Sequence, residues 1–336
     1  MRLPLTTRLA ALALARAIAC AAAVVLPAAP ARAQAGPGSV PVPVLATVGM
    51  IGDLAAQVGG DCAAVEVLIG AGNDPHLYQP RASDIARLQA AQVVLHLGLN
   101  LEGRLGQVLG RLARDRVVVA LGEVAMPADR LLVQHGATDP HLWMDVALWA
   151  LLVPAIADVL AQARPDCLDG LSSRANVLQA ELSVLHDWAL ASLATIPPQA
   201  RVLVTAHDAF GYFARAYGMQ QRAIQGFSTE SEASVADIRA VAAEVVASGV
   251  PAVFVESTIN PRSIQAMLEA VQAAGGRADI GPPLFSDAMG EPGTPEGSYV
   301  GMIRWNVRSI VGALGGTPAP WPEGLQPWAD RHKVAP

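Results

Sequence analysis

Residues 139–145 read Asp139-Pro140-His141-Leu142-Trp143-Met144-Asp145, and the first four letters also occur upstream as Asp74-Pro75-His76-Leu77. Proline restricts its own φ to about −65° and favours an extended conformation in the residue before it. Each Asp-Pro-His is therefore a stiff elbow that aims the imidazole after it. A single isolated histidine is usually a polar residue at a loop or core edge, but two aimed histidines indicate a pair of metal ligands.

Two further polar residues, His207 and Asp287, each come soon after an apolar run. With His76 and His141 they supply three imidazoles and one carboxylate. Such a four-coordinate set of nitrogen and oxygen donors is the kind that Zn²⁺ prefers. The sequence therefore predicts a Zn²⁺ site formed by these four residues.

The composition is that of a soluble α/β protein. The chain has 336 residues, enough for two domains, and 52% of them are hydrophobic but only 4% aromatic. These values favour helices packed on buried parallel strands over an aromatic-rich β-sandwich. The formal net charge is −6 and no basic face is visible in the sequence. We therefore expect no nucleic-acid partner, because phosphate binding requires a basic surface.

Residues 1–33 are typical of an export signal. They contain a basic start, an apolar middle and Ala31-Arg32-Ala33 as a cleavage site. We therefore expect a periplasmic protein whose mature chain begins near Gln34. Lipoprotein processing before Cys20 is an alternative, although the residues before this cysteine match a lipoprotein signal poorly. Arg16 and two prolines in the apolar stretch argue against a membrane-spanning anchor.

Export leaves Cys62 and Cys167 in an oxidising compartment, where a disulfide is permitted. Their spacing matches no CxxC or zinc-finger pattern, which argues against a metal role for sulfur. The sequence alone leaves open whether the two cysteines meet.

Strand and helix patterns alternate along the mature chain. We expect four strands between residues 44 and 119, and a second series of strands and helices between residues 201 and 284. The segment 168–196 between them has the pattern of one long helix, which Pro197-Pro198 ends. The predicted architecture is α/β with two lobes, each a parallel sheet flanked by helices, and the long rigid helix bridges them.

The predicted boundaries are a signal peptide at 1–33, an N-terminal lobe at 34–165, a linking helix at 166–197 and a C-terminal lobe at 198–336. Open α/β sheets bind ligands in the crevice beyond the carboxyl ends of their strands. We therefore expect the metal site in the cleft between the lobes. His76 and His141 would face it from one side, and His207 and Asp287 from the other.

Two more residues are candidates for supporting the ligands. Glu256 ends a predicted strand and is expected to hold the second ring nitrogen of a histidine ligand. His96 also lies at a strand end, but no elbow aims it, so we expect a structural role or the same supporting role.

In order and spacing, these motifs resemble those of the periplasmic solute-binding proteins of zinc and manganese ABC importers. The resemblance rests on Asn73-Asp74-Pro75-His76, the stretch 139–145, His207-Asp208-Ala209-Phe210-Gly211-Tyr212-Phe213, Val253-Phe254-Val255-Glu256 and Ser286-Asp287. It implies two α/β lobes joined by a long helix, with metal ligands at the positions of His76, His141, His207 and Asp287. It also implies an ABC importer permease and its ATPase as partners, and we expect the protein to be a monomer.

The chain departs from many zinc-binding members of that family in one loop. Those members carry a long loop rich in histidine and acidic residues before the second ligand, whereas residues 122–138 contain only Glu123, Asp129 and His135 of these types. Selective capture would then depend on the cleft alone or on a periplasmic metallochaperone that hands over the metal.

The leading hypothesis is capture of Zn²⁺ in the periplasm and its delivery to the permease. Binding of Mn²⁺ or Fe²⁺ is the alternative within the same class, but imidazole suits zinc, and manganese-specific members tend to have a carboxylate where His207 stands. A zinc hydrolase is the alternative from another class. Catalytic zinc usually keeps three protein ligands and an open position for water, so four candidate ligands favour transport over catalysis. A third alternative is an adhesin or surface antigen that shares this fold.

Overall fold

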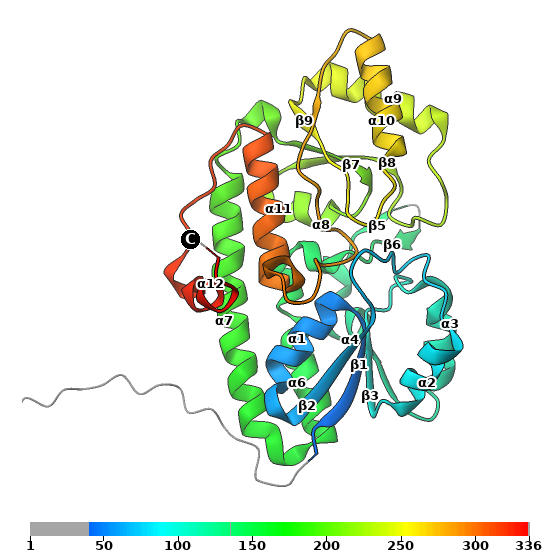
Figure 1. Ribbon diagram of the computed structural model, residues 1–336, viewed down its shortest axis with the longest axis vertical. Helices are drawn as coiled ribbons and strands as arrows, with labels where there is room; N and C mark the ends of the chain where they lie inside the picture. Colours follow the sequence, from blue (N-terminus) through cyan, green and yellow to red (C-terminus); the bar gives the residue numbers. More distant parts are fainter. Residues whose placement is uncertain (1–39, 135, 335–336) are drawn as a thin grey trace, which may run out of the picture. The chain divides into compact units, whose positions relative to one another are not determined.

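The computed structural model describes residues 40–134 and 136–334. The predicted export signal, its cleavage site, the alternative lipoprotein cysteine Cys20 and the loop residue His135 lie outside these residues. The described part of the chain contains two sets of parallel strands, with helices between them (Figure 1).

The first set is a four-stranded parallel sheet in the order β2-β1-β3-β4. Its strands are β1 (Val42–Val48), β2 (Ala63–Ile69), β3 (Val93–His96) and β4 (Val117–Ala120). The helices between and after them are α1 (Gly49–Gly59), α2 (Ala82–Ala90), α3 (Gly103–Leu112) and α4 (Leu121–Ala125). The central strands β1 and β3 are nearly continuous apolar runs because helices cover both faces of a sheet of this kind.

The segment 145–164 forms two helices. After the short hairpin of β5 (Val133–Gln134) and β6 (Ala137–Thr138), the chain enters α5 (Val146–Trp149) and then α6 (Leu152–Ala163). Pro154 is the cause, because proline has no N–H to donate four residues back and is tolerated only in the first turn of a helix. The span Val146–Ala163 is apolar enough in composition to cross a membrane. Here its largest side chain, Trp149, is fully buried in the core.

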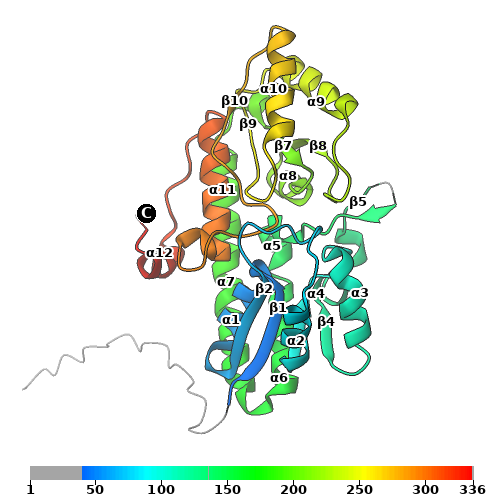
Figure 2. The same ribbon diagram turned by 45° about the vertical axis from the view of Figure 1, so that its right-hand side comes forward.

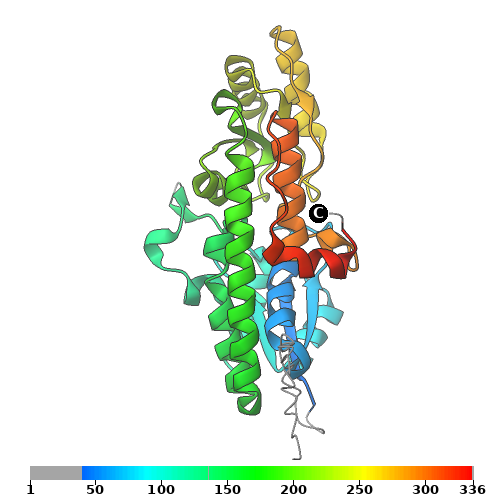
Figure 3. The same ribbon diagram turned by 90° about the vertical axis from the view of Figure 1, so that its left-hand side faces the viewer.

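The long helix is α7, whose 26 residues run from Leu168 to Leu193. It packs against α1 and α6 of the first half and against α8 and α11 of the second, and α11 lies alongside it (Figure 3). A disulfide between Cys62 and Cys167, with an S–S distance of 2.05 Å, ties the start of α7 to the turn between α1 and β2. The pairing that the sequence left open is therefore present.

The second set of strands contains two parallel pairs. β7 (Val202–His207) pairs with β8 (Gln220–Gln225), and β9 (Ala252–Val253) pairs with β10 (Asp279–Ile280). The pairs are joined where the Phe254 N–H donates to the Val204 carbonyl at 2.8 Å. The helices of this half are α8 (Gly211–Tyr217), α9 (Val235–Ser248), α10 (Arg262–Ala273), α11 (Tyr299–Ala313) and α12 (Gln326–His332) (Figure 2).

Strands β9 and β10 each contain only two residues. Pro282 and Pro283 follow β10 closely and cannot donate to a ladder, so regular pairing stops there. A single parallel bridge between Glu256 and Leu284 continues the alignment beyond them. The α/β fold with parallel sheets and one long helix is confirmed, whereas the predicted domain boundaries stay a prediction.

Candidate metal centre

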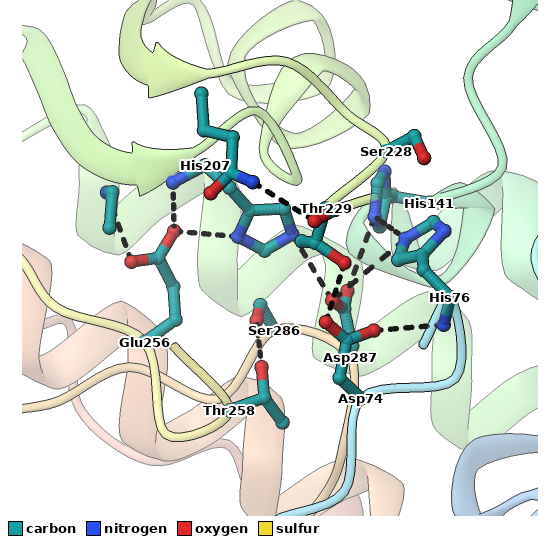
Figure 4. A network of polar contacts seen from close by, with 12 residues as sticks. Asp74, His76, His141, His207, Ser228, Thr229, Glu256, Thr258, Ser286 and Asp287 are labelled. Atoms are coloured by element: carbon teal, nitrogen blue, oxygen red, sulfur yellow. Dashed lines mark hydrogen bonds and ion pairs between the residues drawn. The ribbon is translucent and has the colours of Figure 1, made fainter. Parts of the chain in front are cut away.

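The four predicted ligands come from four separate segments and meet at one point (Figure 4). His76 lies in the loop after β2, His141 follows β6, His207 is the last residue of β7, and Asp287 lies in the loop between β10 and α11. One ligand atom from each residue lies within 4.8 Å of all the others. The site therefore draws on both halves of the chain.

The distances between the ligand atoms suit a small cation. Nε2 of His141 lies 3.4 Å from Nε2 of His76 and 3.2 Å from Oδ1 of Asp287. Oδ2 of Asp287 lies 3.1 Å from Nε2 of His207 and 4.0 Å from Nε2 of His76. A tetrahedral Zn²⁺ with bonds of about 2.0–2.1 Å would separate its ligand atoms by about 3.3 Å. The cluster has this size.

Both Asp-Pro-His elbows are stabilised by their own aspartates, a contact that the proline argument missed. Oδ1 of Asp74 accepts the backbone N–H of His76 at 2.8 Å, and Oδ1 of Asp139 accepts that of His141 at 2.9 Å. This turn, in which an aspartate accepts the N–H two residues on, stiffens the loop independently of the proline. The Asp in each motif was the available signal for it.

Asp139 also orients the imidazole of His141. Its Oδ1 lies 2.7 Å from Nδ1 of that ring, and both side chains are fully buried. Because a carboxylate only accepts hydrogen bonds, Nδ1 carries a proton, and Nε2 is the nitrogen that faces the centre and would bind a metal. Asp74 makes no such contact with the ring of His76 among the recorded hydrogen bonds of the described residues, so the twin motifs differ here.

Glu256 holds the ring of His207, as the sequence predicted for it. Its Oε1 accepts from Nδ1 and from the backbone N–H of His207, both at 2.9 Å, and Oε2 accepts the backbone N–H of Ala206 at 3.0 Å. The buried carboxylate thus has three donors and fixes Nε2 of His207 toward Asp287.

Trp143 contacts the segments that carry two of the ligands, His141 and Asp287. Its indole N–H donates to the carbonyl of Ser286 at 2.8 Å, next to Asp287, and its ring meets the His141 ring edge to face at a centroid distance of 5.2 Å. The hydroxyl of Tyr299 in turn donates to the carbonyl of Trp143 at 2.6 Å. Trp143 belongs to the motif 139–145, but the motif carries no signal for these contacts.

The charges of the cluster fit a site that exchanges protons for a cation. Burial lowers the pKa of His141, but Asp139 and Asp287 outweigh this effect and raise the pKa to about 9. Burial likewise opposes the charged form of His207, yet Asp287 and Glu256 hold its pKa well above the ordinary value. The pKa of His76 is lowered, mainly by burial. The two histidines with raised pKa values carry protons that a bound metal would displace.

Within the described part of the chain, three ligand atoms face only the other candidate ligands. They are Nε2 of His207 and both carboxylate oxygens of Asp287, all buried. Burial raises the pKa of Asp287, but His207 and His141 more than compensate and hold it well below its usual range. A buried carboxylate that stays ionised and faces only the ring nitrogens of the other candidate ligands, at 3.1 and 3.2 Å, has the chemistry of a cation ligand.

Comparison with known proteins identifies the chain. The family described as ZnuA, zinc-uptake complex component A, periplasmic, matches residues 44–313. The protein belongs to this family. Its members are solute-binding proteins of metal ABC importers, not enzymes, and they work with a membrane permease and an ATPase. The hydrolase alternative is therefore wrong.

Related solute-binding proteins are named for binding different metals. The zinc-binding protein TroA of Treponema pallidum is 41% identical over 271 residues, covering 81% of this chain and 88% of that protein. The manganese-binding lipoprotein MntA of Bacillus subtilis is 39% identical over 273 residues, covering 81% and 89%. The two identities are too close to favour either metal.

Solved structures agree with the fold described above. That of periplasmic zinc-binding TroA from Treponema pallidum superposes with a TM-score of 0.80 and covers 82% of this chain and 99% of its own. The structure of Fe(III)-bound YtgA from Chlamydia trachomatis is 30% identical, with a TM-score of 0.76 and coverage of 83% and 99%.

His96 lies away from the four ligands of this solute-binding protein. Its Nδ1 is 3.6 Å from Oε2 of Glu102, a buried carboxylate that also accepts from the Thr47 hydroxyl at 2.8 Å and the Leu97 N–H at 2.7 Å. These contacts indicate a structural role, the first of the two that the sequence suggested for His96.

The centre is closed on most sides. His141 and His207 are fully buried and Asp287 is 1% exposed, whereas His76, 3% exposed, lines a half-open hollow of about 400 Å³. The loop that follows β8 forms part of the wall, and its Thr229 hydroxyl donates to Oδ2 of Asp74 at 2.5 Å. His76 is thus the ligand nearest to solvent.

Proposed function

We propose that this protein captures Zn²⁺ in the periplasm with His76, His141, His207 and Asp287 and delivers it to its ABC permease. The observation that carries the proposal is the donor set, three imidazoles and one carboxylate at spacings of 3.1 to 4.0 Å between neighbours. Imidazole nitrogens suit Zn²⁺, and the spacing matches a four-coordinate ion. Zinc would be the transported cargo and not a catalytic cofactor.

Mn²⁺ or Fe²⁺ is the second candidate cargo, because Asp287 directs both of its oxygens into the centre. Oδ1 faces His141 at 3.2 Å and Oδ2 faces His207 at 3.1 Å. If both oxygens bound, the ion would have five donors, which harder cations accept more readily than zinc does. The relationship to manganese-binding MntA keeps this candidate in view.

The cellular location of the protein and its partners beyond the importer are proposed from the sequence. We propose export by the signal in residues 1–33 and function as a monomer in the periplasm. The short loop before His141 has two acidic residues and one histidine, so selective capture would depend on the cleft alone or on a periplasmic metallochaperone that hands over the metal.

Thermal denaturation with competing metals tests the function. Metal is removed from the mature chain with a chelator, and the melting temperature is measured with Zn²⁺ or Mn²⁺ at about 1,000 times the dissociation constant. Because the ion ties four segments that the unfolded chain cannot hold together, it should add about 4 kcal/mol to the free energy of unfolding. The His141→Ala variant is the control and should lose most of this gain. Preferential stabilisation by Mn²⁺ would favour the second candidate, and an unchanged melting temperature with both ions would refute the site.

A further inference from the structure

The C-terminal segment 315–334 lies beyond the part of the chain that the family match covers, which ends at residue 313. It is nevertheless built into the core: Leu325, Trp328 and Ala329 are at most 3% exposed. The segment runs back along α7 and α11 before ending in α12 (Figures 1 and 3). A segment that lies outside the family match, yet buries three of its side chains in the core, raises the question of what it stabilises.

Its first half is bonded to the long helix α7. The Ala319 N–H donates to the Ser192 hydroxyl at 3.1 Å, and the Trp188 indole N–H donates to the Ala319 carbonyl at 3.0 Å. The rings of Trp188 and Trp321 meet edge to face at a centroid distance of 4.9 Å, and the Arg304 guanidinium from α11 lies 5.3 Å from the Trp321 ring. The segment therefore joins α7 to α11.

Its second half contacts the N-terminus of α11 through Trp328. The Trp328 indole N–H donates to the hydroxyl of Ser298 at 3.0 Å. Ser298 is the N-cap of α11, and its hydroxyl also accepts the Gly301 N–H at 3.2 Å and donates to the Pro295 carbonyl at 2.8 Å. Trp328 thus supplies the last partner of a hydroxyl that holds the start of this helix in place.

The start of α11 leads directly to the metal centre. Tyr299, the residue after the cap, donates its hydroxyl to the Trp143 carbonyl at 2.6 Å, and the Trp143 indole donates to the Ser286 carbonyl at 2.8 Å. Ser286 precedes Asp287, and the Trp143 ring packs on His141. Two of the four ligands are therefore connected to Trp328 by one continuous series of buried contacts.

We propose that the segment 315–334 is a brace that slows metal release, with Trp328 as a positioning residue that acts on His141 and Asp287 through Ser298, Tyr299 and Trp143. The proposal rests on the metal site of the proposed function. A brace of this kind restricts the movements of α11 that would separate Asp287 from the ion. The test measures the energetic coupling between Trp328 and metal release directly.

The test compares two tryptophan variants of the full mature chain. Trp328→Phe keeps an aromatic ring but removes the N–H that bonds Ser298. The matched control is Trp321→Phe, which keeps an aromatic ring beside Trp188 and Arg304 and removes an N–H that donates only within the segment, to the Leu325 carbonyl at 3.3 Å. Each protein is loaded with Zn²⁺ and mixed with excess chelator, and the rate of release is followed by stopped flow. The metal-free melting temperature is recorded in parallel.

We expect Trp328→Phe to release Zn²⁺ about fivefold faster than the wild type, the effect of one neutral hydrogen bond, and Trp321→Phe to change the rate less than twofold. Truncation after Leu314 should accelerate release further. A segment that only adds stability would lower the melting temperature and leave the release rates equal, which would overturn the proposal. Equal acceleration in both tryptophan variants would overturn it too.

A double-mutant cycle tests the path without relying on the truncated chain, which need not fold. Ser298→Ala and Trp328→Phe should act non-additively on the release rate, because both break the same contact. Additive effects would refute the path through Ser298. If the wild type binds no Zn²⁺, the proposed cargo fails instead, and the same comparison is made with Mn²⁺.

Discussion

Replacement of Asp139 by asparagine isolates what one buried charge does for the metal centre. The amide oxygen of asparagine can still accept the backbone N–H of His141, so the elbow keeps its geometry. The negative charge beside Nδ1 of the ring is lost, and with it the main partner that raises the pKa of His141 to about 9 from its ordinary value of 6.5. The matched control is Asp74→Asn in the twin motif, where the carboxylate meets the backbone of His76 but not its ring.

Two opposing effects set the magnitude. Loss of a carboxylate that orients a ligating histidine typically costs 10- to 100-fold in metal affinity. Against this, a histidine with a pKa of about 9 must give up a proton to bind metal, which at pH 7.5 weakens wild-type binding roughly 30-fold. The variant, in which the pKa of His141 is lower because Asp139 no longer raises it, escapes most of this proton competition. The two effects nearly cancel near neutral pH, and only the loss remains near pH 9.

The assay is competitive titration of Zn²⁺ against a chelator of known affinity at pH 7.5 and pH 9. We expect the ratio of the variant's dissociation constant to that of the wild type to rise about tenfold between the two pH values. For Asp74→Asn the ratio should stay within about threefold of one at both. A ratio for Asp139→Asn that does not change with pH would refute the reasoning that Asp139 acts through the charge on His141.

Three further predictions concern selectivity, pH and the disulfide. His207→Glu should raise the affinity for Mn²⁺ relative to Zn²⁺. Because the new carboxylate would lie beside Glu256, the variant should be made together with Glu256→Gln and titrated with both ions. An unchanged ratio of the Zn²⁺ and Mn²⁺ affinities would remove His207 from the site. The metal-free protein should lose stability as the pH rises from 6.5 to 9. The reason is that the folded state raises the pKa values of His141 and His207, so their protonation stabilises the fold below the unfolded-state pKa, and this stabilisation is lost as the pH passes the folded-state pKa. A melting temperature that stays flat or rises across this range would contradict the raised pKa values. Replacing Cys62 and Cys167 together by serine should lower the free energy of unfolding by about 2–4 kcal/mol, as measured by denaturant titration. The affinity for Zn²⁺, measured by chelator competition, should not change. A loss of affinity would show that the disulfide acts on the site.

The positions of the candidate ligands were predictable because each carries its signal within a few residues. The prolines before His76 and His141 restrict the local backbone, and the apolar runs before His207 and Asp287 mark strand ends. In parallel sheets such ends gather at one edge, so local signals sufficed to bring the four residues together. The alternation of strands and helices likewise predicted the α/β fold and the long helix α7.

The partners of these ligands were less accessible. The sequence suggested Glu256 as a supporting residue, but only the fold decides that it meets His207, 49 residues away, and that His96 meets Glu102 instead of the centre. Nothing in the spacing of the twin motifs distinguishes Asp139, which bonds a ring, from Asp74, which does not. The difference lies in tertiary contacts: Oδ2 of Asp74 accepts from the hydroxyl of Thr229, 155 residues away, whereas Oδ1 of Asp139 accepts from Nδ1 of His141.

The sequence by itself therefore determined the fold class, the four candidate ligands and the likeness to the solute-binding proteins of metal importers. Hydrophobic periodicity encodes the fold class, and local backbone stiffness marks the ligand motifs. Only the tertiary structure decided that Cys62 pairs with Cys167, 105 residues apart, and that Trp328 reaches Ser298 at the start of α11. These contacts join segments with no local signal for each other. They exist because the chain buries its apolar faces against one another, and burial brings together side chains whose separation in the sequence carries no information about their meeting.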